Sequence, residues 1–371
     1  MRVADLIAYL EELAPPALAE SYDNVGLLCG HPEAAITGVY CVLDCLPERV
    51  QEAIDRGCNV VVAHHPLIFK GIRRIDARHW TGRALELAIK HDVALYAIHT
   101  NLDNVLPGVN TMLARRIGLL TEQIRPLRPM QGQLLGLATF VPAADAPRVL
   151  QACWAAGAGQ VGQYHNCAFQ TEGQGFFTPG TGTNPHTGQV GRPEQTQELR
   201  LELLVPAHRQ RAVLAALKAS HPYEEVAYYL YPLQNTWQDH GAGAVADLPT
   251  PLPFADFLRQ VCQGLGIGHV RHTEPGPGKL VRRVAVCGGA GAFLLDDAKR
   301  AGADVLLTGD VKHHEFLEAT TGTVFVDVGH YESERLVADE LALKIKEKFA
   351  TFAVHLPEPG QVQSPVHWFT L

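Results

Sequence analysis

The sequence predicts a layered α/β core with mostly parallel sheets, interrupted by an α+β insertion. Strand-like and helix-like segments alternate in the first third of the chain, and the same alternation returns near the C-terminus. A stretch rich in Gly, Pro and Thr separates the two parts. Because 371 residues exceed what one hydrophobic core usually organises, we expect a core plus an inserted domain.

The first part of the core, residues 1–127, alternates apolar strand patterns with helical ones, which is typical of parallel strands covered by helices. Pro107 suits the first turn of its last helix, where a backbone N–H is not needed. The expected helices are at residues 3–13, 47–56, 80–90 and 107–117, and the expected strands at 38–43, 59–63 and 93–98.

Residues 128–235 are expected to form the inserted domain, because the composition changes there and Gly, Pro and Thr accumulate at 173–193. Strand patterns at 134–140 and 198–205 and a helical pattern at 209–220 fit the order β-α-β, irregular stretch, β-α-β. That is the element order of a ferredoxin-like fold. A polar, Gly-containing linker at 234–243 then leads into the second part of the core.

The second part of the core, residues 236–371, repeats the alternation. Its apolar runs predict parallel strands that continue the α/β architecture. The expected strands are at 281–287, 304–307 and 324–328, and the expected helices at 293–300, 313–320 and, as one long helix, 332–349.

Composition narrows the function classes. A net charge of −8 without a long Lys/Arg run opposes binding to a phosphate backbone, so nucleic acid is not an expected partner. The N-terminus lacks a basic segment followed by an apolar one, and no apolar run approaches the roughly 20 residues that span a bilayer. We therefore expect a cytoplasmic protein without a membrane partner.

Imidazoles and carboxylates follow three of the predicted strands. The strand at 59–63 runs into His64-His65-Pro66, the next one ends in a segment that reaches Asp103, and the strand at 324–328 leads to His330 and Glu334. Ligands gather at the carboxyl ends of strands in open α/β sheets. The i, i+4 spacing places His330 and Glu334 on one face of a helical turn. Three imidazoles and two carboxylates could hold two divalent ions if a carboxylate bridges them.

A single histidine at a strand end is more often a polar residue with satisfied hydrogen bonds than a ligand, so the joint pattern carries this interpretation. Imidazole and carboxylate without thiolate suit Zn²⁺, Fe²⁺, Mn²⁺, Co²⁺ or Ni²⁺, and the residues do not choose among them. Gly288-Gly289-Ala290-Gly291 could present N–H groups to a phosphate, but it lacks the spacing of known phosphate loops. A tight turn is the favoured interpretation there.

Five separated motifs resemble the NGG-one-interacting-factor-three-like family, whose members are commonly named GTP cyclohydrolase 1 type 2 homologues. The resemblance implies a dinuclear metal centre, with the family's ligand positions falling on His64, His65, Asp103, His330 and Glu334. It also implies a homo-oligomer, a ring-shaped, toroidal hexamer. The motifs are Tyr22-Asp23-Asn24-Val25-Gly26-Leu27, His64-His65-Pro66-Leu67-Ile68-Phe69, His99-Thr100-Asn101-Leu102-Asp103, Thr308-Gly309-Asp310 and Gly329-His330-Tyr331-Glu332-Ser333-Glu334.

The middle segment carries a resemblance of its own, to the insertion of longer family members, which is similar to the trimeric PII and CutA domains. This similarity implies a role in assembly or gating of the ring, and a folded insertion without such a role stays open. The residues that carry it are Ala156-Gly157-Ala158-Gly159, Gly162-Gln163-Tyr164, Cys167 and His221-Pro222-Tyr223-Glu224-Glu225.

These observations lead to a metal-dependent hydrolase acting on a nucleotide-like substrate. Two bound ions would supply hydroxide near neutral pH, which in a cyclohydrolase would attack the imidazole ring carbon of GTP. His99 and His314 are candidate catalytic proton-transfer groups, and Asp44 and Asp310 are candidates to orient ligands or water. Two alternatives stay open: a metal-binding or metal-delivery protein regulated through the inserted domain, and a ring-shaped interaction scaffold.

Overall fold

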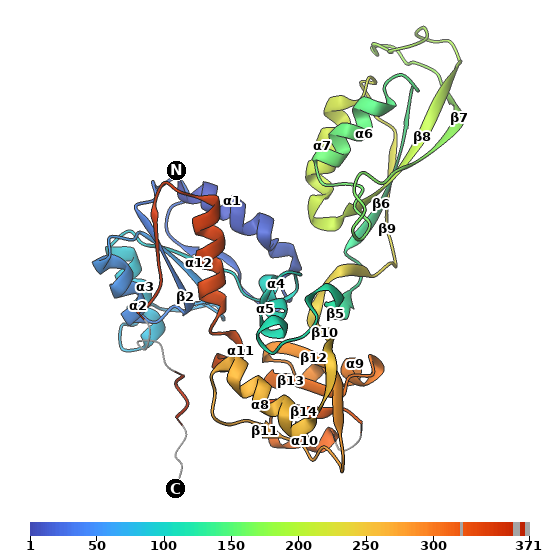
Figure 1. Cartoon of the computed structure of the whole chain (residues 1–371). Helices are drawn as coiled ribbons and strands as arrows, with labels where there is room; N and C mark the ends of the chain where they lie inside the picture. The colour runs from blue at the N-terminus through green and yellow to red at the C-terminus, as the bar shows by residue number, and fades with distance from the viewer. Residues whose placement is uncertain (320–321, 359–363, 368–371) are drawn as a thin grey trace. The chain divides into compact units, whose positions relative to one another are not determined.

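The computed structural model describes residues 1–319, 322–358 and 364–367 of the chain (Figure 1). Over these residues it is a mixed α/β structure with three sheets, which agrees with the α/β class predicted from the sequence. The chain forms two compact units, here called the core unit (Met1–Arg128 with His240–Leu371) and the middle unit (Pro129–Asp239). Within the described ranges, none of the helices is both long and apolar enough to cross a lipid bilayer.

The first sheet of the core unit has the strand order β1-β4-β3-β2-β15. Strands β15, β2, β3 and β4 run parallel, and β1 is antiparallel to β4. The side chains of β2, β3 and β4 are almost fully buried because helices cover the sheet, which explains why these strands read as unbroken apolar runs. The strands are β1 (Gly26–Cys29), β2 (Gly38–Asp44), β3 (Val60–His65), β4 (Ala94–Ala97) and β15 (Ala353–His355).

Helices α2 (Pro47–Asp55) and α3 (Trp80–Lys90) pack on this sheet through small and branched side chains. Helix α12 (Val337–Lys348) contacts β2, β3 and β15, and α1 (Val3–Leu13) packs beside it, where the Tyr9 hydroxyl donates to the Lys344 carbonyl at 3.1 Å. The remaining elements before the second sheet are η1 (Pro16–Leu18), α4 (Thr100–Asp103), α5 (Val109–Arg116) and η2 (Thr121–Gln123).

The second sheet of the core unit has the order β11-β14-β13-β12-β10-β5, with β12, β13 and β14 parallel. Helix α8 (Phe254–Leu265) packs on one face through Phe257 and Val261, and α9 (Leu295–Arg300) packs on the other through Ala298. The other elements are β5 (Arg125–Met130), β10 (Trp237–Pro253), β11 (Arg271–His272), β12 (Leu280–Ala290), η4 (Ala292–Leu294), β13 (Val305–Gly309), α10 (His313–Glu318), β14 (Val324–Asp327) and α11 (His330–Glu334).

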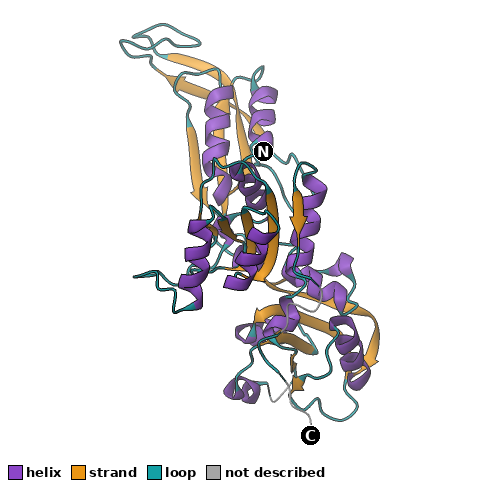
Figure 2. Cartoon of the chain, turned by 90° about the vertical axis from the view of Figure 1, so that its left-hand side faces the viewer, coloured by secondary structure: helices purple, strands orange, loops and turns teal. Residues whose placement is uncertain are grey.

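The middle unit contains one antiparallel sheet, β7-β8-β6-β9, whose chain order with its helices is β6-α6-β7-β8-α7-β9. The two long helices pack against each other and against one face of the sheet, as Figure 2 also shows. The elements are β6 (Leu134–Val141), α6 (Ala146–Ala155), β7 (Phe169–Phe177), β8 (Glu194–Pro206), η3 (Ala207–Arg209), α7 (Gln210–Ser220) and β9 (Tyr228–Pro232).

Two expectations from the sequence are wrong. The single helix at 332–349 is two helices, α11 and α12, separated at Arg335 and Leu336. The break lets the chain pass from the second sheet, which α11 contacts at β12 and β13, to the first sheet, which α12 contacts at β2. The linker at 234–243 largely belongs to β10. His240 pairs with Val105 and the Gly241 N–H donates to the Asn104 carbonyl, which keeps this polar stretch extended before the pairing with β12 begins at Ala244. The predicted end of the helix at 313–320 lies outside the described residues.

Candidate metal centre

The ends of three strands bring imidazoles and carboxylates together in the core unit. His64 and His65 are the last two residues of β3, Asp103 ends the short helix α4 that follows β4, and His330 and Glu334 begin and end α11 after β14. Segments more than two hundred positions apart in the sequence therefore share one site. The side chains come from the carboxyl ends of parallel strands in both sheets of the core unit, which is where open α/β sheets place ligands.

Glu334 lies at the centre of the cluster and is 2% exposed. Its Oε1 lies 3.8 Å from His64 Nε2, while its Oε2 lies 3.0 Å from both His65 Nε2 and His330 Nε2. His64 Nε2 is also 3.7 Å from Asp103 Oδ1. Two ligand sets result, His64–Asp103–Glu334 and His65–His330–Glu334, and each could hold a metal ion. The two oxygens of Glu334 face different sets.

All the imidazoles of the cluster turn Nε2 inwards because Nδ1 is already hydrogen-bonded elsewhere. His64 Nδ1 lies 2.8 Å from the Ile98 carbonyl oxygen, His65 Nδ1 lies 2.8 Å from Asp44 Oδ1, and His330 Nδ1 lies 2.8 Å from Asp310 Oδ2. An Nδ1–H that donates to such an acceptor fixes the tautomer and leaves Nε2 free to bind a metal. Asp44 and Asp310 therefore lie where residues that orient ligands would lie.

Two buried atoms of the cluster lack a hydrogen-bond partner among the described residues. These are His64 Nε2 and Asp103 Oδ1. Unpaired buried polar atoms are costly and uncommon in folded proteins. Their separation of 3.7 Å is too long for a hydrogen bond, yet it suits two donor atoms that bind the same cation. The nitrogen and oxygen donors present fit a divalent transition metal.

The neighbouring carboxylates favour the protonated, positively charged forms of His65 and His330. Burial opposes protonation of His65, but hydrogen bonds to Asp44 and Glu334 raise its pKa to about 10. Burial likewise opposes protonation of His330, but Glu334 and Asp310 raise its pKa to about 9. Burial raises the pKa of Asp103, and the neighbouring Glu334 carboxylate raises it further. A bound cation would interact favourably with all of these carboxylates and imidazoles at once.

The glycines at the end of β12, Gly288 and Gly289, bring the backbone close to this site. A Cβ added at Gly289, whose φ is +62°, would lie 2.5 Å from Glu334 Oε1. The backbone N–H groups of Gly288, Gly289 and Gly291 donate to the side chains of Asn110, Ser333 and Thr308. These N–H groups are thus engaged within the protein, which argues against a phosphate loop. The segment is the irregular end of β12, where the pairing with β13 shifts register between Val286 and Ala290, and not the tight turn expected from the sequence.

His99 extends the cluster, whereas His314 does not. The His99 ring lies 5.2 Å from the His64 ring and 5.4 Å from the His65 ring, measured between centroids, and the three histidines form a further set of candidate ligands. His314 lies on α10, and its described ring contact is with His313. The hydrogen bonds and ring contacts described for the cluster do not include His314.

Asp23 is a residue of the site that the sequence did not single out by role. Its Oδ1 lies 2.9 Å from His99 Nδ1, and its Oδ2 accepts from the Thr100 backbone N–H at 3.0 Å and from the Thr100 hydroxyl. Burial opposes its ionisation, but these hydrogen bonds lower its pKa to about 2. Asp23 precedes β1 and does not follow a strand, so only its position inside a family motif could have drawn attention to it.

Comparison with known proteins agrees with the resemblance of the motifs. The family model for Duf34/NIF3 (NGG1p interacting factor 3) matches residues 1–358. A Bacillus subtilis protein named GTP cyclohydrolase 1 type 2 homolog is 38% identical over 342 residues, covering 92% of this chain and 91% of that protein. A Staphylococcus aureus protein of the same name is 34% identical, covering 96% of each chain.

Solved structures lead to the same family. The crystal structure of a Bacillus cereus protein related to NIF3 superposes with a TM-score of 0.86 at 34% identity, covering 100% of this chain and 99% of that one. A Staphylococcus aureus crystal structure superposes with a TM-score of 0.76 at 30% identity, with the same coverage. The chain therefore belongs to the Duf34/NIF3 family.

Proposed function

We propose that this protein binds two divalent metal ions and hydrolyses a nucleotide-like substrate. The observation that supports a dinuclear centre is the position of Glu334, whose two carboxylate oxygens face two separate ligand sets. One set consists of His64, Asp103 and Glu334, and the other of His65, His330 and Glu334. The shared glutamate would bridge the ions, which can be Zn²⁺, Fe²⁺, Mn²⁺, Co²⁺ or Ni²⁺ with these donors.

Divalent ions at such a site lower the pKa of water and so provide hydroxide near neutral pH. In this proposal Asp44 and Asp310 hold the His65 and His330 rings in orientation through 2.8 Å contacts to Nδ1. His99 acts in proton transfer, because its ring borders His64 and His65 while Asp23 holds its Nδ1. Asp23, which the contacts add to the site, would fix the His99 tautomer. The geometry gives no reason to retain His314 in this role.

The substrate class rests on the relatives, which are named as homologues of a GTP cyclohydrolase. The second candidate function is metal binding or delivery without turnover. It is favoured by the uneven exposure of the two ligand sets, since the His64 side chain is 0% exposed and the His330 side chain is 36% exposed. An ion beside His330 would be reachable from solvent for transfer to another protein.

The test is to load the protein with each metal in turn and incubate it with a panel of nucleotides that includes GTP. Hydrolysis should depend on metal and be lost in Asp103→Ala and Glu334→Ala. The matched control is Glu332→Ala, which removes a carboxylate from the same helix, α11, without touching either ligand set. Tight binding of two ions with no turnover across the panel would favour the second candidate.

We also propose that residues 128–235 are an inserted ferredoxin-like domain similar to PII and CutA, and that the chain forms a hexamer. The element order β6-α6-β7-β8-α7-β9 and the two helices on one sheet face support the first proposal. The motif resemblance supports the second. Sedimentation of the full chain tests it directly, because a mass other than six times 40.4 kDa would contradict it.

A further inference from the structure

A cavity of about 660 Å³ opens in the core unit next to the metal centre. Its lining begins at Pro66, the residue after the candidate ligand His65, and continues through the loop that leads to α3, as far as Leu85 in that helix. Cavities of this size hold small organic molecules in other proteins. A ligand in this cavity would therefore lie beside the candidate ions.

Phe69 connects the cavity with the metal centre. Its ring lines the cavity and lies 6.2 Å from the His99 ring, measured between centroids. The Tyr22 ring lies 6.2 Å from the same Phe69 ring. Phe69 is 43% exposed and Tyr22 is 62% exposed, so both offer ring surface to a ligand. A ligand that contacts Phe69 from the cavity is thus one side chain away from His99.

The loop between Lys70 and His79 is positively charged. It contains four Lys or Arg residues and one carboxylate, whereas the whole chain has a net charge of −8. The carboxylate, Asp76, is paired with Arg78 at 2.6 Å. Lys70 and Arg74, which both line the cavity, form no ion pair with another residue in the part of the chain that the structure describes. Their charge is therefore available to an anion.

Both ends of this loop are tied to the fold. The Asn24 side chain donates to the Ile68 carbonyl at 2.6 Å, and the His79 N–H donates to the Asp76 carbonyl at 3.0 Å. The same Asp76 carbonyl packs so closely on Gly82 of α3 that an added Cβ would collide with it. A loop with fixed ends loses less conformational entropy when a ligand binds.

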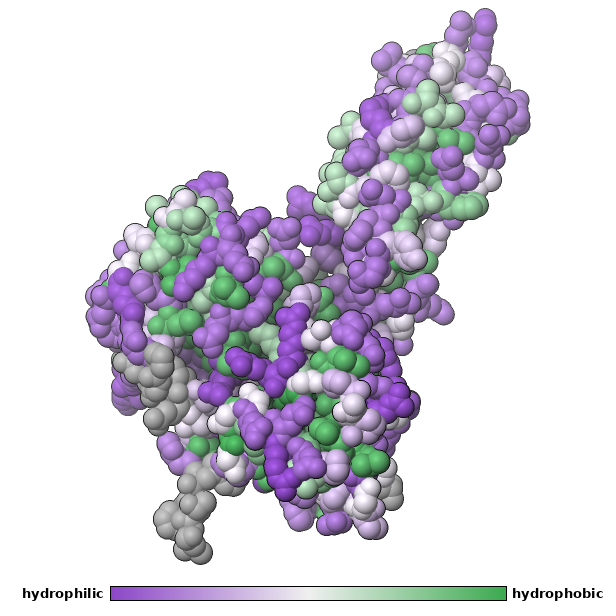
Figure 3. Space-filling model, in the orientation of Figure 1, coloured by the Kyte–Doolittle hydropathy of each residue, from purple (hydrophilic) through white to green (hydrophobic). Residues whose placement is uncertain are grey.

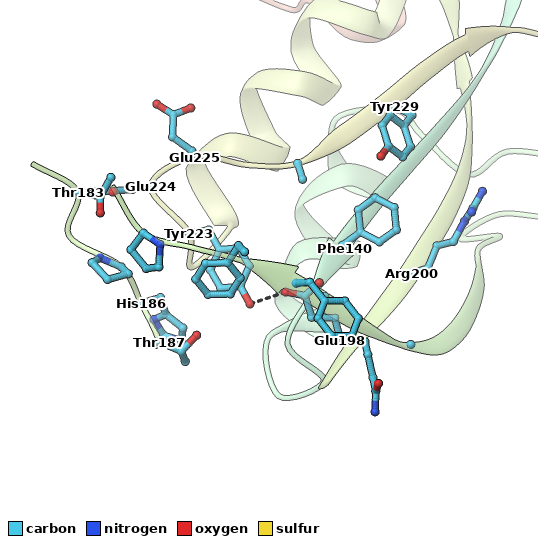
Figure 4. Close-up of a pocket in the computed structure, with 18 of the residues that line it drawn as sticks. Phe140, Thr183, His186, Thr187, Glu198, Arg200, Tyr223, Glu224, Glu225 and Tyr229 are labelled. Atoms are coloured by element: carbon cyan, nitrogen blue, oxygen red, sulfur yellow. Dashed lines mark hydrogen bonds between the residues drawn. The ribbon is translucent and has the colours of Figure 1, made fainter. Parts of the chain in front are cut away.

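The charge of the lining distinguishes this cavity. Exposed apolar side chains alone do not mark a site, since hydrophobic residues are interspersed with hydrophilic ones on the face shown in Figure 3. The cavity of the middle unit in Figure 4 has the opposite charge, because Glu198, Glu224 and Glu225 line it. Arg200 in that lining is already paired with Glu202 at 2.6 Å. Phosphate would be repelled there and attracted to the cavity of the core unit.

We propose that the cavity beside the metal centre holds the phosphate chain of the nucleotide-like substrate, an inference that rests on the proposed function. Lys70 and Arg74 bind the phosphate oxygens, Arg74 through its planar guanidinium and Lys70 as a point charge. Phe69 contacts the nucleoside, whose base lies towards His99 and the ions. The loop thus provides affinity for the charged part of the substrate, and the metal centre provides the reacting groups.

Calorimetric titration of the full chain with guanosine, GMP and GTP tests this, with and without Zn²⁺. The metal-free arm removes both turnover and contacts between phosphate and metal. In that arm affinity should rise from guanosine to GTP. The double variant K70Q/R74Q should weaken GTP binding about tenfold or more, as expected for lost hydrogen bonds between charged groups. Its binding of guanosine should stay within about twofold of wild type.

The matched control is K90Q/K346Q, which also removes two positive charges from exposed positions of the core unit, outside the cavity lining. It should change GTP binding by no more than about twofold. Phe69→Ala leaves the charge unchanged and should weaken guanosine and GTP binding alike, about fivefold or more, the size of a contact between a base and an aromatic ring. Circular dichroism checks that every variant is folded.

Equal affinity of the metal-free wild type for guanosine and GTP, or equal weakening in K70Q/R74Q and in the control, would overturn the proposal. Tighter binding of a single-stranded DNA oligonucleotide than of GTP, lost in K70Q/R74Q, would also overturn it, because the loop would then bind nucleic acid. Turnover is scored separately. GTP binding that depends on Lys70 and Arg74 without any turnover would support the phosphate site and contradict the hydrolase. Turnover of GTP with an unchanged KM in K70Q/R74Q would do the reverse.

Discussion

Replacing Asp44 by asparagine should weaken the binding of one metal ion and leave the binding of the other nearly unchanged. Asp44 Oδ1 lies 2.8 Å from His65 Nδ1, and the two residues are neighbours in register across β2 and β3. His65 belongs to the ligand set with His330 and Glu334, whereas His64 is oriented by the backbone carbonyl of Ile98. The variant therefore perturbs only the His65 set.

The expected size of the effect follows from the contact. An asparagine oxygen still accepts the Nδ1–H, so ring orientation is kept and only the negative charge is lost. Removing a partner that orients a metal ligand costs 10–100-fold in affinity, or about 1.4–2.7 kcal/mol. Because the Asp44 side chain is 45% exposed, solvent screening favours the lower half of that range, about 10–30-fold.

The assay is competition of the protein with a chelator for Zn²⁺, fitted to two binding steps. One step should weaken by that factor in Asp44→Asn, and the other should stay within about threefold of wild type. Glu48→Gln, an exposed carboxylate on α2 that pairs with Arg83, serves as the control. Equal weakening of both steps, or no weakening of either, would refute the assignment of Asp44 to one ligand set.

Other contacts lead to three more predictions. Gly289→Ala should abolish binding of at least one ion, because the added Cβ would lie 2.5 Å from Glu334 Oε1. Gly57→Ala is the control: Gly57 has φ +70° and open space around it, so this change should lower the free energy of unfolding by only about 1–2 kcal/mol. Chelator competition measures ion binding and thermal unfolding measures stability in both variants. Asp23→Asn should lower kcat of any metal-dependent turnover about tenfold or more with two ions still bound, because His99 loses the partner that fixes its tautomer; unchanged kcat would contradict this. His208 stacks on Trp237, and burial lowers its pKa to about 4, so the unfolded chain takes up a proton between pH 6.5 and about 4 while the folded one does not. Stability should therefore fall across that window as pH decreases, and urea titrations at several pH values should show a shallower fall in His208→Gln.

Much of the core could be predicted from sequence because its strands are buried on both faces. In a chain that alternates strand and helix patterns, a short apolar run such as residues 59–63 predicts a buried strand. The helices predicted at 3–13 and 80–90 also end where the patterns indicate. The long strand β10 was missed because its polar start looks like a linker. Its pairing with β12, for example of Ala244 with Val286, joins residues far apart in the sequence and is a tertiary effect that no local pattern contains.

The candidate site, too, could be predicted from the sequence only in part. His64, His65 and Asp103 could be found because they lie at or shortly after the carboxyl ends of strands, where open α/β sheets place ligands. The roles of Asp23 and of Gly289 could not be assigned, since each depends on what lies beside it in space. The role predicted for His314 stays a prediction, since its described ring contact is with His313 and not with the cluster. The break between α11 and α12 was hidden because continuous helical periodicity masks a change of packing partner.

Anomalous diffraction from metal-loaded crystals would locate the bound ions. We expect two peaks in the core unit, one flanked by His64 and Asp103 and the other by His65 and His330, with the Glu334 carboxylate between them. A single peak, or peaks away from Glu334, would contradict this expectation.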